Sequence, residues 1–209
     1  MIGGPNAALD EGVGVPPRWW FICEDRSELL QLQERFWSWN WRRQDSAPGS
    51  PVAYPGFDAI KAKAQASIDE LKNHGELIGK PFPNPGVCEL LYDNVIPLSP
   101  DNGSFRLADL LTEYTACPPK TKAGWQMAWH EPLGDATGPE VARILIVLGG
   151  MVSPDATDVV QIAKMAFNVG SLVSSWDEAF DFYEKAHRFV RKRFLELTTD
   201  KAHTMWGMT

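Results

Sequence analysis

The 209-residue chain has few cysteines and no long apolar run, and each shortage excludes a class of protein. Its three cysteines, Cys23, Cys88 and Cys117, are odd in number, far apart and without paired spacing, which favours reduced thiols over a disulfide framework. The longest aliphatic run, residues 144–148, is far too short to cross a bilayer. The first residues also lack a basic start and a sustained apolar stretch, so we expect a cytoplasmic protein without membrane contact.

Sequence motifs for catalysis and cofactor binding are missing as well. Gly149 and Gly150 fit no phosphate-binding loop, and there is no nucleophile elbow and no specific paired-carboxylate motif. The four histidines show no metal-ligand spacing with one another or with the cysteines. The sequence therefore predicts no metal and no cofactor, and it leaves enzymatic activity undecided, with the balance against it.

The composition is that of an ordinary globular protein. Apolar residues make up 44% of the chain, which is enough for one generous domain or two small ones. The charged fraction of 22% argues against disorder over most of the length. A formal net charge of -7 disfavours general nucleic-acid binding.

The chain is rich in tryptophan, and the most informative stretch is QLQERFWSWNWRR at residues 31–43. Large rings alternate there with small or polar residues, so as one strand it places Trp37, Trp39 and Trp41 on one face. Three indoles in a row either anchor a core or form a platform for a ligand. Arg42 and Arg43 follow directly and could add positive charge to such a platform.

The first half of the chain predicts strands and one helix. Residues 18–23 and the run from Leu29 onward are typical of an antiparallel hairpin around the polar turn EDRSE, although a helix over 27–37 is the competing interpretation. Apolar residues at steps of three and four predict an amphipathic helix near 56–74, which Gly75 would stop. Residues 88–96 are then predicted to form a third strand of the same sheet, with the helix as the connection between the hairpin and this strand.

The second half predicts three more strands and a long helix. The strands lie near 125–130, 142–148 and 158–169, between Gly, Pro and Asp turns. Ser175 and Glu178 have the spacing of a capping box at the start of the helix near 176–198. Seven residues are expected to line its buried face: Trp176, Phe180, Tyr183, His187, Val190, Phe194 and Leu197.

These elements predict an α+β fold with antiparallel sheets from two successive β-rich halves. The amphipathic helix near 56–74 and the C-terminal helix near 176–198 pack against the sheets. Residues 1–17, rich in Gly and Pro, are expected to form a flexible arm. Residues 18–209 are expected to form a single α+β domain, with 18–100 and 101–209 as its two possible sub-halves.

The favoured function is that of a non-catalytic protein-interaction module. Its binding residues would be Trp37, Trp39, Trp41, Arg42 and Arg43, and its partner another protein or a second copy in a homo-oligomer. Stacking of nucleic-acid bases on the same rings is a weaker interpretation because the whole chain is acidic.

The alternative is an enzyme or a nucleic-acid-processing component. It would use His187 as a general base in a cleft, with Tyr183 and Arg42 beside it. A hydrogen-bonded structural role for His187 is the stronger interpretation, because buried polar groups find partners for stability alone.

Overall fold

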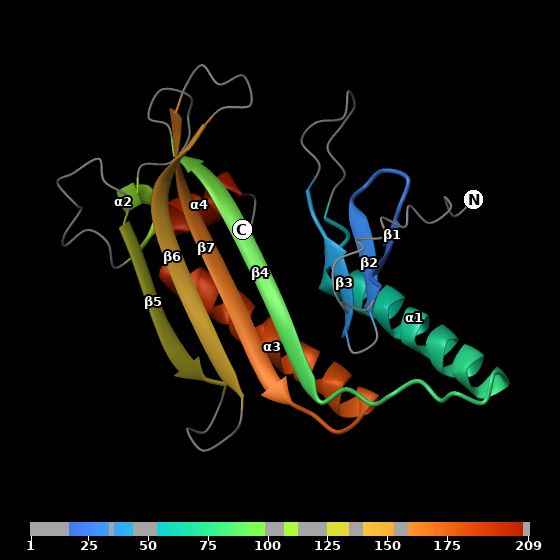
Figure 1. Ribbon diagram of the computed structural model, residues 1–209. Coiled ribbons are helices and arrows are strands. Elements are labelled where there is room, and N and C mark those ends of the chain that lie inside the picture. The colour runs from blue at the N-terminus through green and yellow to red at the C-terminus, as the bar shows by residue number, and fades with distance from the viewer. Residues whose placement is uncertain are drawn as a thin grey trace. The chain divides into compact units, whose positions relative to one another are not determined.

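The computed structural model describes residues 17–33, 36–43, 54–98, 107–112, 125–133, 140–152 and 159–206. Within these residues the fold is α+β, as predicted, with one three-stranded and one four-stranded antiparallel sheet and helices beside them (Figure 1). The chain divides into two compact units, Met1–Phe82 and Pro83–Thr209. The predicted N-terminal arm lies outside the described residues except for Pro17, and so does Cys117.

The first unit contains a sheet of three short strands in the order β1-β2-β3. They are β1 (Trp19–Ile22), β2 (Glu28–Gln33) and β3 (Phe36–Trp41), and all pairings are antiparallel. Trp19 lies opposite Leu32, which confirms the predicted hairpin. The competing helix over 27–37 is wrong, since aromatic and aliphatic residues alternate here with the two-residue period of a strand.

Residues 31–43 do not form one continuous strand, and that prediction is wrong. Gln33 pairs with Phe36, so the chain reverses direction between them and the alternating pattern belongs to two neighbouring strands. The reversal sets Trp37 opposite Leu32 and Trp39 opposite Leu30, which packs each ring beside an aliphatic side chain on the same face. Gln31, paired with Ser38, therefore lies on the face away from these rings.

Helix α1 (Phe57–Leu77) is the predicted amphipathic helix, but it continues past Gly75. Gly75 is needed for a close approach and does not end the helix. A Cβ atom there would lie 2.5 Å from the carbonyl oxygen of Lys80. The chain folds back over the helix end through Gly79, whose φ of 68° is in the left-handed region that glycine adopts without strain.

The second unit contains a sheet of four longer strands in the order β4-β7-β6-β5. The strands are β4 (Val87–Leu98), β5 (Trp125–Pro132), β6 (Val141–Val152) and β7 (Val159–Leu172), so the three strands predicted in the second half are confirmed. The prediction that residues 88–96 return to the first sheet is wrong. β4 pairs along its whole length with β7, because matching two long strands satisfies more backbone groups than pairing with the short strands of the first unit.

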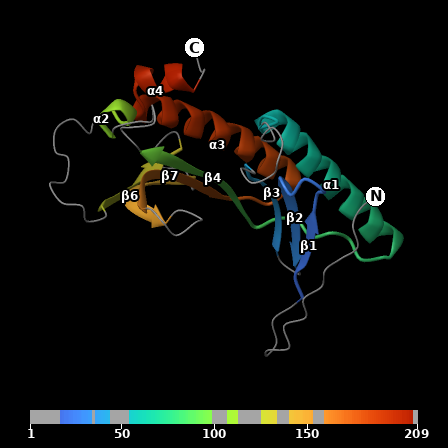
Figure 2. The ribbon, with the colours of Figure 1, turned by 90° about the horizontal axis from the view of Figure 1, so that it is seen from above.

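Helix α3 (Trp176–Leu197) covers one face of the four-stranded sheet (Figure 2). The predicted N-terminus is correct, since Ser175 Oγ accepts a hydrogen bond from the Glu178 backbone N–H at 3.2 Å. The Glu178 carboxylate accepts from the N–H and hydroxyl of Ser174, one residue earlier than in a standard capping box. Two short helices, α2 (Leu107–Leu110) and α4 (Asp200–Met205), complete the unit.

Three of the seven residues predicted for the buried face of α3 are buried, namely Trp176, Val190 and Leu197, but the other four are not at its centre. Phe180, Tyr183, His187 and Phe194 are only half-buried, whereas two alanines and Phe182 lie at the centre of the contact. Small side chains there let the helix approach the sheet closely, and a pattern of large apolar residues does not reveal them. The buried residues of α3 are Trp176, Ala179, Phe182, Ala186, Val190 and Leu197.

Candidate interaction surface

Strand β1 is the most exposed apolar strand of the first unit. Its four residues Trp19, Trp20, Phe21 and Ile22 keep 43%, 50%, 39% and 53% of their surface in water. The strand is at an edge of the sheet, with β2 on one side only. The sequence RWWFIC has no charge between Arg18 and Glu24, so neither face of β1 is polar. Such a patch is characteristic of binding surfaces in soluble proteins.

The three tryptophans of β3 are less exposed than β1. Trp37, Trp39 and Trp41 are half-buried, and Trp41 packs edge-on against Tyr54 with 4.9 Å between the ring centroids. The indole N–H groups of Trp39 and Trp41 are buried without a hydrogen-bond partner among the described residues. These rings therefore act chiefly as core, which is one of the two roles predicted for them, and their binding role stays a prediction.

The helix α1 packs on the side of the sheet that carries these rings. Lys63 of α1 forms an ion pair with Glu28 at 2.5 Å, and Glu28 lies opposite Trp41 on the same sheet face. Residues on one face of paired strands point the same way, so the helix covers the β3 end of this face. β1, at the other edge, is left open.

Arg42 and Arg43 are exposed and directly follow β3. The backbone N–H of Arg42 donates to the Ser27 carbonyl at 2.8 Å, and its Nε donates to the Arg26 carbonyl at 3.4 Å. Arg42 thus holds the β1–β2 turn in place. Its side chain would have to keep this structural contact and also serve the predicted role in a cleft. Arg43 has interactions within the protein as well.

The turn after β1 is ordered by the carboxylate of Asp25. It accepts hydrogen bonds from Cys23 Sγ at 2.8 Å, from the Ser27 N–H at 2.9 Å and from the Ser27 hydroxyl at 2.7 Å. These bonds, the one from Cys23 first, lower the pKa of Asp25 from 3.8 to about 2. A shallow open hollow beside the turn is lined by Cys23, Glu24, Asp25, Ser27, Glu28 and Lys63. The turn fixes the end of β1, and its residues 24–26 are exposed like the strand, whereas Ser27 is buried.

His187 and Tyr183 lie in the second unit, each with a hydrogen-bond partner on β4. His187 Nδ1 bonds the Tyr92 hydroxyl at 2.8 Å, and Tyr183 bonds the thiol of Cys88. Burial, with a smaller contribution from Cys88, raises the pKa of Tyr183 far above its usual value. Burial likewise raises the pKa of Cys88. Both groups are therefore protonated and neutral at ordinary pH, as packing groups are.

The predicted catalytic trio is not assembled within either unit, because Arg42 belongs to the first unit and His187 and Tyr183 to the second. His187 is oriented by Tyr92, a residue that the sequence did not single out. The enzymatic role of these three residues stays a prediction.

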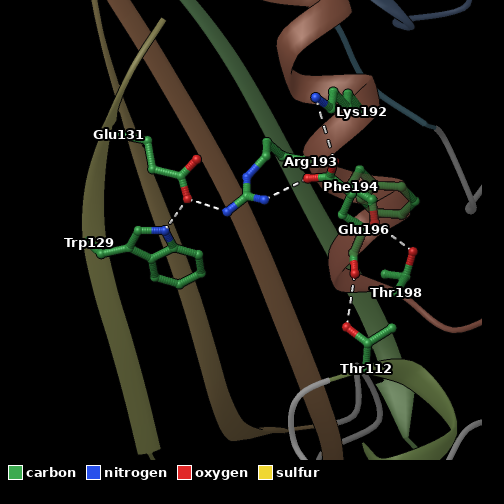
Figure 3. A network of polar contacts seen from close by, with 8 residues as sticks. All are labelled: Thr112, Trp129, Glu131, Lys192, Arg193, Phe194, Glu196 and Thr198. Atoms are coloured by element: carbon green, nitrogen blue, oxygen red, sulfur yellow. Dashed lines mark hydrogen bonds and ion pairs between the residues drawn. The ribbon is translucent and has the colours of Figure 1, made fainter. Parts of the chain in front are cut away.

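Arg193 is at the centre of a polar network that joins α3 to β5 (Figure 3). It donates to the carboxylates of Glu131 and Glu196, and Trp129 Nε1 donates to the same Glu131 at 2.6 Å. The hydrogen bond to Glu131 is the main cause that raises the pKa of Arg193. These contacts tie the edge strand β5 to α3, although Nε of Arg193 is buried without a hydrogen-bond partner among the described residues.

Searches for a metal site and for a membrane-spanning helix in the part of the chain that the structure describes, and for similar proteins, gave no match. Among the described residues there is no group of three His, Cys, Asp or Glu side chains that could hold a metal ion. Over the same residues, no helix is both long and apolar enough to span a membrane. A scan of family models and searches of curated proteins and of solved structures found no match to this chain.

The sequence analysis missed β1 as the open surface. The strands β1 and β3 are both rich in aromatic residues, and only the tertiary fold decides which of them α1 covers. A usable signal did exist in the sequence: WWFI puts apolar residues on both faces of a short strand. A strand covered on one face alternates apolar with polar residues instead.

Proposed function

We propose that this protein is a non-catalytic interaction module that binds another polypeptide through strand β1. The observation that carries this proposal is the exposure of four consecutive apolar residues, three of them aromatic, at the edge of a sheet. Aromatic residues at the centre of interfaces supply most of the binding free energy, because they remove a large apolar area from water at a low entropy cost.

Other exposed apolar residues do not form a comparable surface. Leu77 is the most exposed of them, at 85%, and with the adjacent Ile78 it forms only a two-residue apolar group at the end of α1. On the open face of the second sheet, Leu91 and Val95 flank Asp93, which forms an ion pair with Lys164 at 2.7 Å. Single apolar residues on a surface are ordinary, whereas a contiguous patch without charge favours binding.

The contacts of the predicted catalytic residues support the same choice. His187, Tyr183 and Arg42 each hold a neighbouring element in place through the hydrogen bonds described above. These contacts give the residues a structural reason to be present, so they lend no support to a catalytic role.

The proposed compartment is the cytoplasm. Cys23 and Cys88, the two cysteines that the structure describes, are free thiols. Free thiols are stable in a reducing compartment, which supports this location.

The test is an affinity purification of the tagged full-length protein from its native host, with quantitative mass spectrometry. Ile22→Lys places a charge in the patch at a half-exposed position, and Leu77→Lys is the matched control at an exposed residue outside it. A second copy carrying a different tag is co-expressed so that self-association is also detected. Circular dichroism checks that both variants fold.

We expect a partner, or the second copy, to be recovered with the wild type and with Leu77→Lys. Recovery with Ile22→Lys should fall by about tenfold or more, since a desolvated charge in an interface core costs over about 1.4 kcal/mol. Equal recovery with both variants would contradict the proposal, and so would the absence of any partner including the second copy.

A further inference from the structure

The outer edge of β1 carries backbone groups that no described strand satisfies. The Cys23 N–H donates to the Glu28 carbonyl at 3.2 Å, so the backbone groups of Cys23 point toward β2. Because these groups alternate in an antiparallel strand, those of Phe21 and Trp19 also point toward β2. The N–H and C=O groups of Trp20 and Ile22 therefore point outward. An edge strand of this kind is a template for one more strand.

We infer that the strand added to this edge is β1 of a second copy, antiparallel to the first, so that two three-stranded sheets join into one six-stranded sheet. The inference rests on the proposed function, because it uses the same surface and names the partner. The symmetry axis passes beside Phe21, which faces Phe21 of the second copy. Trp20 then faces Ile22 of the second copy, and each outward backbone group gains a partner.

The side chains of β1 are complementary to themselves in this register. Trp20 and Ile22 lie on one face of the strand, so each dimer contains two cross-strand pairs of an aromatic with a β-branched residue. Phe21 lies on the other face and meets its own copy at the axis. No charge within β1 opposes the pairing.

Charge at the strand ends selects the same register. With Phe21 at the axis, Arg18 faces Glu24 of the second copy, and both residues are exposed in the single chain. Shifting the axis to Trp20 sets Arg18 opposite Ile22, and shifting it to Ile22 sets Glu24 opposite Trp20. Each shift leaves Arg18 and Glu24 without an opposite charge across the interface. Each shift also leaves only one of the two outward-pointing residues, Trp20 or Ile22, facing β1 of the second copy. The Phe21 register is therefore favoured.

The area available fits a weak dimer. From the exposed fractions of the four side chains, β1 offers roughly 350 Å² of apolar side-chain surface per copy. The backbone, Arg18 and Glu24 add to this, which brings two copies together to about 1,000 Å². Interfaces of this size are at the low end of specific ones, so we expect a dissociation constant in roughly the micromolar range.

The first experiment is a charge exchange on the full-length protein, followed by sedimentation equilibrium from low to several hundred micromolar concentration. Arg18→Glu and Glu24→Arg each set two like-charge contacts into the dimer, and each should weaken association about fivefold. The double variant restores opposite charges and should return to within about twofold of the wild type. Lys72→Glu on α1 is the control, since it changes the net charge as Arg18→Glu does.

Glu24→Arg also guards against a folding effect. Arg18 Nε donates to Gln33 within the chain at 3.3 Å, so Arg18→Glu removes an internal contact as well. No internal side-chain contact of Glu24 is described, and weakening by both single variants therefore points to the interface.

The second experiment tests the axis by cross-linking. Phe21→Cys puts two thiols at a non-hydrogen-bonded pair, where Cα atoms are about 4.5 Å apart and a disulfide can form. Oxidised Phe21→Cys should give a covalent dimer linked at that position by peptide mapping. Trp20→Cys, which faces Ile22 of the second copy, is the matched control and should give none through position 20.

The outcomes separate this inference from the proposed function. Rescue in the double variant together with the Phe21→Cys link supports the inference. The inference is overturned if the protein is a monomer at all concentrations. It is also overturned if self-association is unchanged in both charge variants and Phe21→Cys forms no disulfide-linked dimer. If that monomer still retains a host protein that Ile22→Lys loses, the partner is a different chain and the proposed function stands. If it retains none, both proposals fail.

Discussion

The two units combine the same ingredients, an antiparallel sheet and an amphipathic helix, but the helix covers a different part of the sheet in each. Beneath α3, the β7 residues Met165, Phe167 and Val169 are wholly buried. In the first unit α1 covers the β3 end and leaves the three rings and the isoleucine of β1 in water. Whether an aromatic strand becomes core or surface is therefore decided by the reach of the helix and not by the strand's own composition.

The largest difference between the units is expected from two matched phenylalanine variants. Phe167→Ala removes a fully buried ring and should lower the free energy of unfolding by about 3–5 kcal/mol. Phe21→Ala removes a ring that is 39% exposed and should cost about 1 kcal/mol or less. Urea unfolding of the two variants measures both values, and equal losses would contradict the contrast between core and surface.

A second comparison uses one glycine from each unit. Gly75→Ala places a methyl group 2.5 Å from the Lys80 carbonyl oxygen and should cost about 1–3 kcal/mol, since the backbone must move. Gly149→Ala in β6 has open space around the added atom and should change stability by less than about 0.5 kcal/mol. Thermal unfolding of both variants and the wild type measures these two changes in stability. A harmless Gly75→Ala would mean that the chain after α1 does not pack as described.

The third prediction concerns the anchoring of β5, the edge strand of the second unit. Glu131→Gln weakens the acceptor of both Arg193 and Trp129 and should cost about 1–2 kcal/mol. Glu140→Gln is the control and should be nearly neutral, because the Glu140 carboxylate pairs with the exposed Lys185 at 3.6 Å. Amide hydrogen exchange should show faster opening of β5 in Glu131→Gln alone, and unchanged exchange would argue against the anchoring role.

The smallest effect is expected at the turn after β1, and it depends on pH. The folded-state pKa of Asp25 is about 2, below its ordinary value of 3.8. The contribution of the ionised Asp25 carboxylate to folding stability is therefore present above about pH 4 and is lost as the pH falls toward 2. Nuclear magnetic resonance titration should show the amide signal of Ser27 shifting in this window. Asp25→Asn should abolish that shift, and a shift centred near pH 4 would contradict the lowered pKa.

The sequence was sufficient for the elements with strong periodicity. The hairpin, α1, α3 and the strands of the second half follow from local patterns of two or 3.6 residues. The partner of β4 did not follow, because pairing with β7 joins residues more than 60 positions apart and leaves no local trace. The core of α3 was misplaced for a related reason, since Ala179 and Ala186 are buried by their fit to the sheet.

The candidate surface was only half predictable. An aromatic binding region near the start of the chain was expected, but the row Trp37, Trp39 and Trp41 was named and β1 was not. The choice between the two strands depends on where α1 lies, which is a tertiary fact. The Tyr92 partner of His187 was missed in the same way, since the two residues are 95 positions apart.

The order β4-β7-β6-β5 has a consequence for synthesis on the ribosome. Because the first strand of the second sheet pairs with the last, β4 stays without its neighbour until residue 172 has left the exit tunnel. The hairpins of the first unit pair residues close in sequence, so they can close while the nascent chain is still growing. The surface strand β1 is thus formed early, and the late-closing sheet sets the time at which the second unit becomes native.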